Sequence, residues 1–538
     1  MGEQIYTVIG SGPSAVHAAL TLLERGKRVR LLDVGEEEKP IPYPEVNFLE
    51  LKSKLSDPFR FFLGEHAEGV LSPNREEIFS YPPVRNFHVS SHNPYFRVEG
   101  KEFVPIVSHN RGGLGVAWGA NCLPYDADDM RDFPVSSQEF ASAYERVGKR
   151  IAICGERQEE GGSFLPLNRH DAQVWKKYLE HQHLLQKKFR IVMERARMAV
   201  DTDPHSPTRC ISCNRCLWGC GVGAIYNPTA TLELCRRYEQ FEYRSGIYVT
   251  SFGIEHGKVT KIHFFDIPRQ QFDTLSAETV LLGAGALSSA GIFLRTLKND
   301  PQFAPQWKER QLRTRSVMDT QVIKLPYLLW RALGSQVDPH DFQFNKLILG
   351  YMNETCSHYP RYVHAEVLSL SSLLYHPLIE SLPFGSRDSA RIFAQIRSAL
   401  GVATYFLPDR PYGENGISLE PDGGTITGDR LKITYQTDPQ KMALAEEACQ
   451  YTRRVFRRLG CWMPKKKMLQ PKPGSGIHYA GTIPMSKERD ILCIDSKGAS
   501  FAYPNLYVID GSGFPTLPSK SITFSLMANA TRIAEHVS

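Results

Sequence analysis

The sequence predicts an α/β fold, because segments with strand and helix patterns alternate near both ends of the chain. Residues 6–9 form a short apolar run, residues 15–25 carry apolar side chains at helical spacing, and residues 29–32 return to a strand pattern. Near the other end, residues 505–536 read as a strand, a proline-containing loop and a helix. With 538 residues, 42% of them hydrophobic, the chain can bury a large core divided among two to four domains.

The charge balance does not favour a nucleic-acid partner, and the hydropathy excludes a membrane-spanning helix. The 64 lysines and arginines are dispersed among 58 acidic residues, and this mild balance does not predict nucleic-acid binding. No stretch approaches the roughly 18 uninterrupted apolar residues that a membrane-spanning helix needs. The first residues enter a strand pattern at once, which leaves no room for a signal peptide. We therefore expect a cytoplasmic protein, for which peripheral membrane contact stays open.

A glycine-rich turn joins the first predicted strand to the first predicted helix. It reads GSGPSA, the G-x-G-x-x-A form of the dinucleotide-binding fingerprint. In this pattern Gly10 permits the tight turn, Gly12 lets a pyrophosphate approach the helix N-terminus, and Ala15 permits close packing of helix on sheet. Asp33 ends the second strand, where a carboxylate can accept a hydrogen bond from a ribose hydroxyl. The sequence therefore predicts a dinucleotide site.

Five separated stretches resemble the glucose–methanol–choline (GMC) oxidoreductases and occur in the order of that family. They are the N-terminal fingerprint and residues 111–129, 278–294, 474–485 and 505–536. The resemblance implies that the dinucleotide is FAD and that a Rossmann-like FAD-binding domain of GMC type wraps it with both chain ends. The cofactor-binding residues that follow from the fingerprint and the resemblance are Gly10, Gly12, Ala15, Asp33, Gly112, Gly113, Asn121, Ala284, Asp510, Gly511 and Thr523.

The same resemblance divides the chain into two domains. The FAD-binding domain would comprise residues 1–315 and 456–538, including a cysteine-rich loop at 205–228, and a discontinuous α+β substrate-binding domain would comprise residues 316–455. The family varies most in this second region, so its sequence does not reveal the substrate. A leucine-rich run at 365–385 favours a buried core element, and an apolar binding surface is the alternative.

Two residues are expected to act on the substrate. His478 lies in GSGIHYAGTIPM, which resembles the stretch that carries the catalytic histidine of the family. Alcohol oxidation by a flavin needs a base for the hydroxyl proton, and the usual histidine pKa of about 6.5 suits that role. The second catalytic position of the family, usually histidine or asparagine, falls on Ser521. A serine hydroxyl can donate a hydrogen bond but is no base at neutral pH, so proton transfer would fall to His478.

Residues 210–220 read CISCNRCLWGC, with the spacing C-x2-C-x2-C-x3-C. Zinc sites of four cysteines usually pair two separated C-x2-C knuckles, whereas this compact spacing is typical of iron–sulfur loops. In a reducing compartment disulfides are disfavoured, and zinc or plain buried thiols remain as alternatives. Some bacterial GMC dehydrogenases resemble this chain in carrying such a loop, which implies a cluster. It would be [4Fe–4S] with four ligands or [3Fe–4S] with three, and the ligands would be Cys210, Cys213, Cys216 and Cys220.

Together these patterns predict a FAD-dependent dehydrogenase that oxidises a CH–OH group of a sugar or sugar-like substrate. Electrons would leave through the iron–sulfur cluster to a one-electron acceptor such as a cytochrome or ferredoxin. Two alternatives stay open. The first is a flavin reductase of a C=C or C=O group that receives electrons from ferredoxin, and the second is a non-catalytic FAD-binding protein with a structural cluster.

Overall fold

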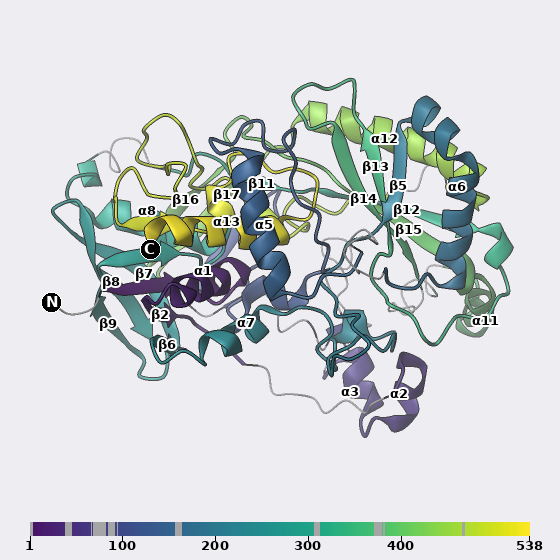
Figure 1. Cartoon of the computed structure of the whole chain (residues 1–538), viewed down its shortest axis with the longest axis horizontal. Helices are drawn as coiled ribbons and strands as arrows, with labels where there is room; N and C mark the ends of the chain where they lie inside the picture. The colour runs from purple at the N-terminus through teal and green to yellow at the C-terminus, as the bar shows by residue number, and fades with distance from the viewer. Residues whose placement is uncertain are drawn as a thin grey trace.

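The computed structural model describes residues 4–37, 46–65, 67, 82–83, 85, 92–93, 95–155, 164–305, 312–370, 379, 382–464 and 468–538. These residues form two large parts side by side, one holding both chain ends and the other built on a broad antiparallel sheet (Figure 1). The mixture of parallel and antiparallel sheets with covering helices confirms the predicted α/β class. Among the described residues, no helix is both long enough and apolar enough to span a bilayer.

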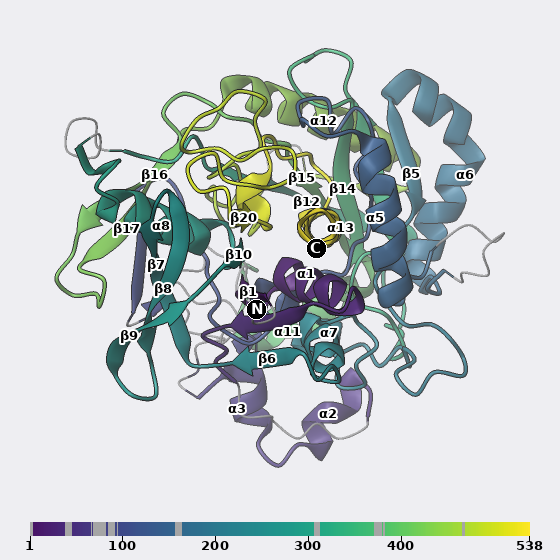
Figure 2. The ribbon, with the colours of Figure 1, turned by 60° about the vertical axis from the view of Figure 1, so that its left-hand side comes forward.

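A parallel five-stranded sheet forms the centre of the first part, in the order β20-β10-β1-β2-β6. Its strands are β1 (Ile5–Ile9), β2 (Arg28–Leu32), β6 (Phe241–Arg244), β10 (Thr279–Leu282) and β20 (Leu506–Val508). Its helices are α1 (Pro13–Glu24), α5 (Ser137–Arg150), α7 (Pro228–Cys235) and α13 (Ile522–Val537). Helix α13 lies beside α1, so both chain ends build the same layer (Figure 2).

The predicted βαβ unit is present, and its glycine turn is sterically required. Gly10 has a φ of +96°, and a Cβ there would lie 2.6 Å from the carbonyl oxygen of Gly283. Only glycine at position 10 therefore lets the backbone after β1 pass this close to the backbone after β10. Pro13 occupies the first turn of α1, where its missing N–H costs nothing. Ala15 is fully buried where α1 packs on the sheet, as the fingerprint predicts.

Two smaller sheets flank this part. One is antiparallel, with β7 (Ile247–Glu255), β8 (Lys258–Asp266) and β9 (Gln271–Ser276). The other has β16 (Gly416–Pro421), β17 (Asp429–Thr434), β4 (Phe96–Gly100) and β3 (His92–Asn93). Helix α8 (Ala286–Asn299) contacts both β7 and β16. A two-stranded ribbon pairs β11 (Met318–Asp319) with β19 (Tyr479–Ala480), the strand that directly follows His478.

The second part is a six-stranded antiparallel sheet in the order β18-β12-β15-β14-β13-β5. Its strands are β5 (Ile191–Arg195), β12 (Val322–Leu329), β13 (Leu347–Met352), β14 (Tyr362–Ser369), β15 (Leu400–Phe406) and β18 (Cys461–Trp462). Helices α6 (Arg169–Phe189) and α12 (Pro439–Arg458) cover one face and share its apolar core (Figure 1). Helix α11 (Ser386–Ile396) lies at the edge of this second part, below α6 in Figure 1. The domain boundaries at 315 and 456 stay a proposal, and this sheet also takes β5 from outside the range 316–455.

Two short helices project from the body of the protein, α2 (Phe48–Lys54) and α3 (Pro58–Leu63) (Figure 1). Their aromatic residues pack against Trp218 of the cysteine-rich loop, and the ring of Phe61 stacks on the indole at a centroid distance of 5.2 Å. Trp218 is only 2% exposed as a result. The two helices therefore cover one side of the loop at 205–228.

Candidate active site

A cavity of about 1090 Å³ is lined by residues of both parts. It brings together twelve residues that the sequence predicts for the site. They are Gly10, Gly12, Asp33, Gly113, Asn121, Cys216, Ala284, His478, Asp510, Gly511, Ser521 and Thr523. Among the described residues, Ala15, Gly112, Cys210, Cys213 and Cys220 are not part of the lining.

The turn after β1 opens onto this cavity. A Cβ on Gly12 would meet no described atom within 4 Å, so the backbone there borders free space. Gly12 is also the N-cap of α1, whose first N–H groups lack partners within the helix. Open space beside these donors fits a pyrophosphate group. A Cβ on Gly113 would lie 3.5 Å from the Cα of Gly12, so the second glycine-rich loop borders the same space.

Asp33 lies at the cavity wall, and two hydroxyl groups donate to its carboxylate. Ser11 donates from Oγ to Oδ2, and Tyr243 donates from its hydroxyl to the same oxygen at 3.2 Å. Burial raises the pKa of Asp33 to about 6, although these hydrogen bonds act in the opposite direction. The backbone N–H of Gly112 donates to Ser11 Oγ at 2.8 Å. Gly112 therefore supports the Asp33 side of the cavity through Ser11.

Asp510 joins the C-terminal strand to the turn after β10. Its Oδ2 accepts hydrogen bonds from the N–H of Gly285 at 2.8 Å and from Ser289 Oγ at 2.6 Å. Its Oδ1 accepts from the N–H of Ser512 at 2.9 Å. Because both oxygens bind protein groups, we propose that Asp510 positions the backbone around Gly511 at the cavity.

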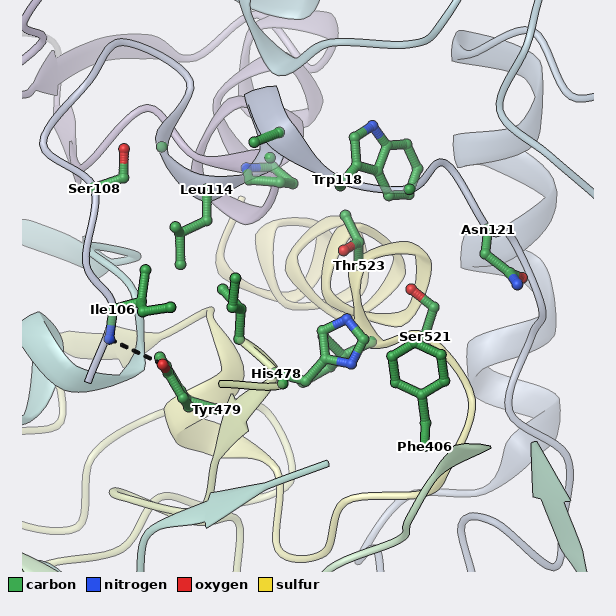
Figure 3. A pocket seen from close by; sticks show the side chains of 18 of the residues that line it. Ile106, Ser108, Leu114, Trp118, Asn121, Phe406, His478, Tyr479, Ser521 and Thr523 are labelled. Atoms are coloured by element: carbon green, nitrogen blue, oxygen red, sulfur yellow. Dashed lines mark hydrogen bonds between the residues drawn. The ribbon is translucent and has the colours of Figure 1, made fainter. Parts of the chain in front are cut away.

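His478 projects into the cavity beside Ser521 and Phe406 (Figure 3). Its Nδ1 lies 2.8 Å from Thr320 Oγ1, and its ring stacks on Phe406 at a centroid distance of 5.7 Å. Burial lowers the pKa of the imidazole to about 4, so the ring is neutral at neutral pH. When Nδ1–H donates to Thr320, the lone pair of Nε2 is left to accept a proton.

Ser521 is the N-cap of α13, and its side chain makes no capping hydrogen bond with the described chain. Thr523 in the first turn also lines the cavity (Figure 3). The N-terminus of α13 therefore faces the cavity, where it favours negative charge. The preceding loop is fixed to β14, because Ser519 Oγ accepts from the N–H of His364 and donates to the carbonyl of Tyr362, both at 2.9 Å.

Asn121 connects the second glycine-rich loop to the six-stranded sheet. Its Nδ2 lies 3.3 Å from both His364 Nε2 and Glu366 Oε1. Its Oδ1 is buried with no hydrogen-bond partner among the described residues, so it can accept from a bound molecule. Burial raises the pKa of Glu366 to about 7. Sequence reasoning missed His364, Glu366 and Thr320, since each sits in an ordinary strand or loop pattern without a motif.

The cysteine-rich loop reaches the cavity through Cys216. Its four thiols lie near enough that the other three each raise the pKa of Cys216, although burial is the largest cause. Ser212 and Asn214 have positive φ, so the loop is tightly wound. The described residues nevertheless contain no group of three or more His, Cys, Asp or Glu side chains that could hold a metal ion. The predicted iron–sulfur cluster is therefore not supported by this arrangement.

Comparison with known proteins supports the predicted relationship. Residues 411–530 match the family model described as GMC oxidoreductase. The whole chain is similar in fold to pyridoxine 4-oxidase from Mesorbium loti, with a TM-score of 0.64, 14% sequence identity and 99% of both chains covered. None of the curated proteins matches this chain. The family-model match supports the predicted GMC resemblance over residues 411–530, and the structural match supports the predicted fold.

Proposed function

Because residues 411–530 match the GMC oxidoreductase family model, we propose that the chain uses FAD to oxidise the CH–OH group of a small molecule. The proposal depends on the surroundings of His478. His478 is neutral, is held by Thr320, and faces the same cavity as the open Gly12 turn. When bound, FAD would supply the hydride acceptor. Gly10, Gly12, Gly113 and the start of α13 would hold it.

The residues of the chain would handle the proton. Nε2 of His478 accepts the hydroxyl proton of the substrate, while Thr320 holds Nδ1–H and so maintains the tautomer. Ser521 donates a hydrogen bond to the substrate oxygen, next to the N-terminus of α13. Phe406 stacks on one face of the imidazole. The proton acceptor and the hydrogen-bond donor therefore come from two segments that meet only in the fold.

Anaerobic mixing of the FAD-loaded protein with a panel of alcohols, sugars included, tests this proposal. Bleaching of the flavin absorbance by a member of the panel is the expected result. If instead a C=C or C=O compound oxidises the reduced flavin, the chain is a reductase. If neither change occurs with any compound, the chain is a FAD-binding protein without this activity. The panel includes sugars because the sequence predicts a sugar or a sugar-like substrate.

Thr320→Val tests the positioning of the imidazole. Valine has nearly the shape of threonine but cannot accept Nδ1–H, and a lost neutral hydrogen bond of about 0.5–1.5 kcal/mol corresponds to a fall of about 2- to 12-fold in kcat. KM should change little, because Thr320 does not line the cavity among the described residues. Thr320→Ser restores the hydroxyl and should restore kcat. A fall that serine does not rescue would contradict the positioning role.

We also propose, from the cysteine spacing, that Cys210, Cys213, Cys216 and Cys220 can hold an iron–sulfur cluster. A single zinc ion needs four thiolates at about 2.3 Å, which places the sulfurs within about 4 Å of one another. Because the described residues contain no group of three or more side chains that could hold a metal ion, this proposal rests on the cysteine spacing alone. Cys216 at the cavity is consistent with electron transfer from the cavity to an acceptor such as a cytochrome or ferredoxin.

Cys213→Ser tests the cluster. Protein purified without oxygen should contain iron and show a paramagnetic resonance signal, and both should be lost in the variant. Flavin bleaching by substrate in a single turnover should persist, while steady-state transfer to a one-electron acceptor collapses. Cys356→Ser lies outside the loop and is the matched control. Stoichiometric zinc without iron, or normal turnover of Cys213→Ser, would refute this role.

A further inference from the structure

One face of the six-stranded sheet forms a wall of the cavity. In β12, β15 and β14, alternate side chains line it, as the period of a strand requires. They are Lys324, Pro326, Val402, Thr404, Phe406, Glu366 and Leu368. Their neighbours in sequence, such as Ile323, Ala403 and Val367, instead join the core under α6 and α12. The side chains at the cavity are thus separate from those that hold the sheet to its helices.

The register places these side chains in rows across the sheet. Lys324 pairs with Thr404, and Thr404 pairs with Glu366, which makes one polar row. The next row, two residues along each strand, consists of Pro326, Val402 and Leu368 and is apolar. Successive rows lie about 7 Å apart, because each residue of a strand advances about 3.4 Å.

The two rows lie at different distances from Phe406, the residue that stacks on His478. Phe406, which stacks on His478, lies two residues from Thr404 on β15. The polar row therefore lies about 7 Å from Phe406 along the strand, and the apolar row lies about 14 Å from it. A molecule with its hydroxyl at His478 would meet the polar row first and the apolar row beyond it.

Further residues outside these rows also line the cavity. The apolar ones include Phe344, Leu370, Met468 and Leu469, and the polar residues Gln343, Ser369 and Gln470 adjoin them in sequence. The backbone of Leu469 pairs with that of Lys324 at 2.9 and 3.0 Å, so this segment is fixed to the edge of the sheet. Leu469 is 53% exposed, so the cavity reaches the protein surface at this edge of the sheet, beside Lys324. Of the leucine-rich run predicted at 365–385, residues 371–378 and 380–381 lie outside the described residues.

Resting on the proposed function, we infer that the substrate is an alcohol with an apolar body and a second polar group, and that Lys324, Thr404 and Glu366 recognise this group. An apolar body would bury its surface against Pro326, Val402 and Leu368. A free sugar would place hydroxyl groups against this row, where they would lose hydrogen bonds to water without replacing them. The cavity therefore favours an amphipathic alcohol over a sugar.

Tertiary alcohols separate binding from oxidation, because their carbinol carbon carries no hydride. We expect the Kd of 2-methyl-2-alkanols for the FAD-loaded protein, measured by titration calorimetry, to fall about fourfold for each added methylene up to the length of the cavity. In Leu368→Asn this dependence on chain length should be lost. Phe272→Asn, on exposed β9, makes the same kind of change outside the cavity lining and should leave it intact.

The polar row is tested with ligands of equal length, a mono-alcohol and a set of diols whose second hydroxyl is moved stepwise along the chain. Thr404→Val and Glu366→Leu should each weaken the tightest-binding diol about 2- to 12-fold relative to the mono-alcohol. The valine variant preserves the shape of threonine, so it remains informative if Glu366→Leu does not fold. An unchanged ratio in both folded variants would overturn the role of the row.

The two proposals fail in different ways. If primary alcohols or sugars bleach the flavin but neither chain length nor Leu368→Asn affects binding, the inferred substrate class is wrong and the oxidation stands. If tertiary alcohols bind as described but no primary or secondary alcohol bleaches the flavin, the oxidation is wrong while the binding preference stands. Tighter binding of a free sugar than of a matched apolar alcohol would also overturn the inferred class.

Discussion

Replacing His478 by alanine is expected to slow reduction of the bound flavin by substrate by about 10²- to 10⁴-fold, the usual effect of losing a general base. Nδ1 of His478 contacts Thr320 and the side chain lines the cavity, so alanine removes this proton acceptor from the cavity wall. FAD binding should persist, because the Gly12 turn is formed by another segment. Rapid mixing of enzyme and substrate without oxygen measures the rate of this step.

His340→Ala is the matched control, because His340 is exposed and does not line the cavity among the described residues. It should reduce the flavin at the wild-type rate. A loss below about threefold in His478→Ala, far under the range for a general base, would place the base elsewhere.

The pH profile provides an independent check of the same residue. Burial lowers the pKa of His478 to about 4, so the imidazole is protonated only below that pH. As the pH falls, kcat/KM should decline with an apparent pKa near 4 and not near the ordinary histidine value of about 6.5. This decline should be absent from the residual activity of His478→Ala.

Gly12→Val is expected to abolish FAD binding without unfolding the chain. A Cβ at Gly12 would meet no described atom within 4 Å, so the fold can accommodate it. The added side chain would instead occupy the space at the N-terminus of α1 where a pyrophosphate must approach the backbone. The purified variant should lack flavin absorbance but keep a native circular dichroism spectrum.

Two further glycines make this result specific. Gly423→Val also adds a side chain to open space, in the turn between β16 and β17, and should retain FAD. Gly10→Val should fail to fold, because its Cβ would lie 2.6 Å from the carbonyl oxygen of Gly283 and its φ is +96°. Full flavin occupancy in Gly12→Val would show that the fingerprint does not bind the cofactor.

The dinucleotide fold was predictable from the sequence because its determinants are local. Gly10, Gly12 and Ala15 act within one turn and one helix, and Asp33 ends the next strand. The positive φ of Gly10 and the places of Gly12 and Ala15 at the start of the helix are set within this turn, although the clash that a Cβ at Gly10 would make comes from Gly283. The resemblance then located His478 and Ser521, which the structure brings to one cavity with Gly12.

Other parts of the site depend on contacts between distant segments. Thr320 lies 158 residues from His478 in sequence, and Asn121 lies 245 residues from Glu366, so no spacing pattern could predict either contact. The polar and apolar rows likewise exist only through the register of three strands.

The cysteine loop also depends on contacts that its spacing does not specify. The spacing suggests a cluster, but the approach of the four sulfurs depends on the surrounding chain.

The sequence by itself determined the glycine turn and the βαβ unit, because local sterics and hydrogen bonding specify them. Only the tertiary structure decided which groups orient His478 and what lines the substrate side, because those contacts form when separate strands and loops pack together.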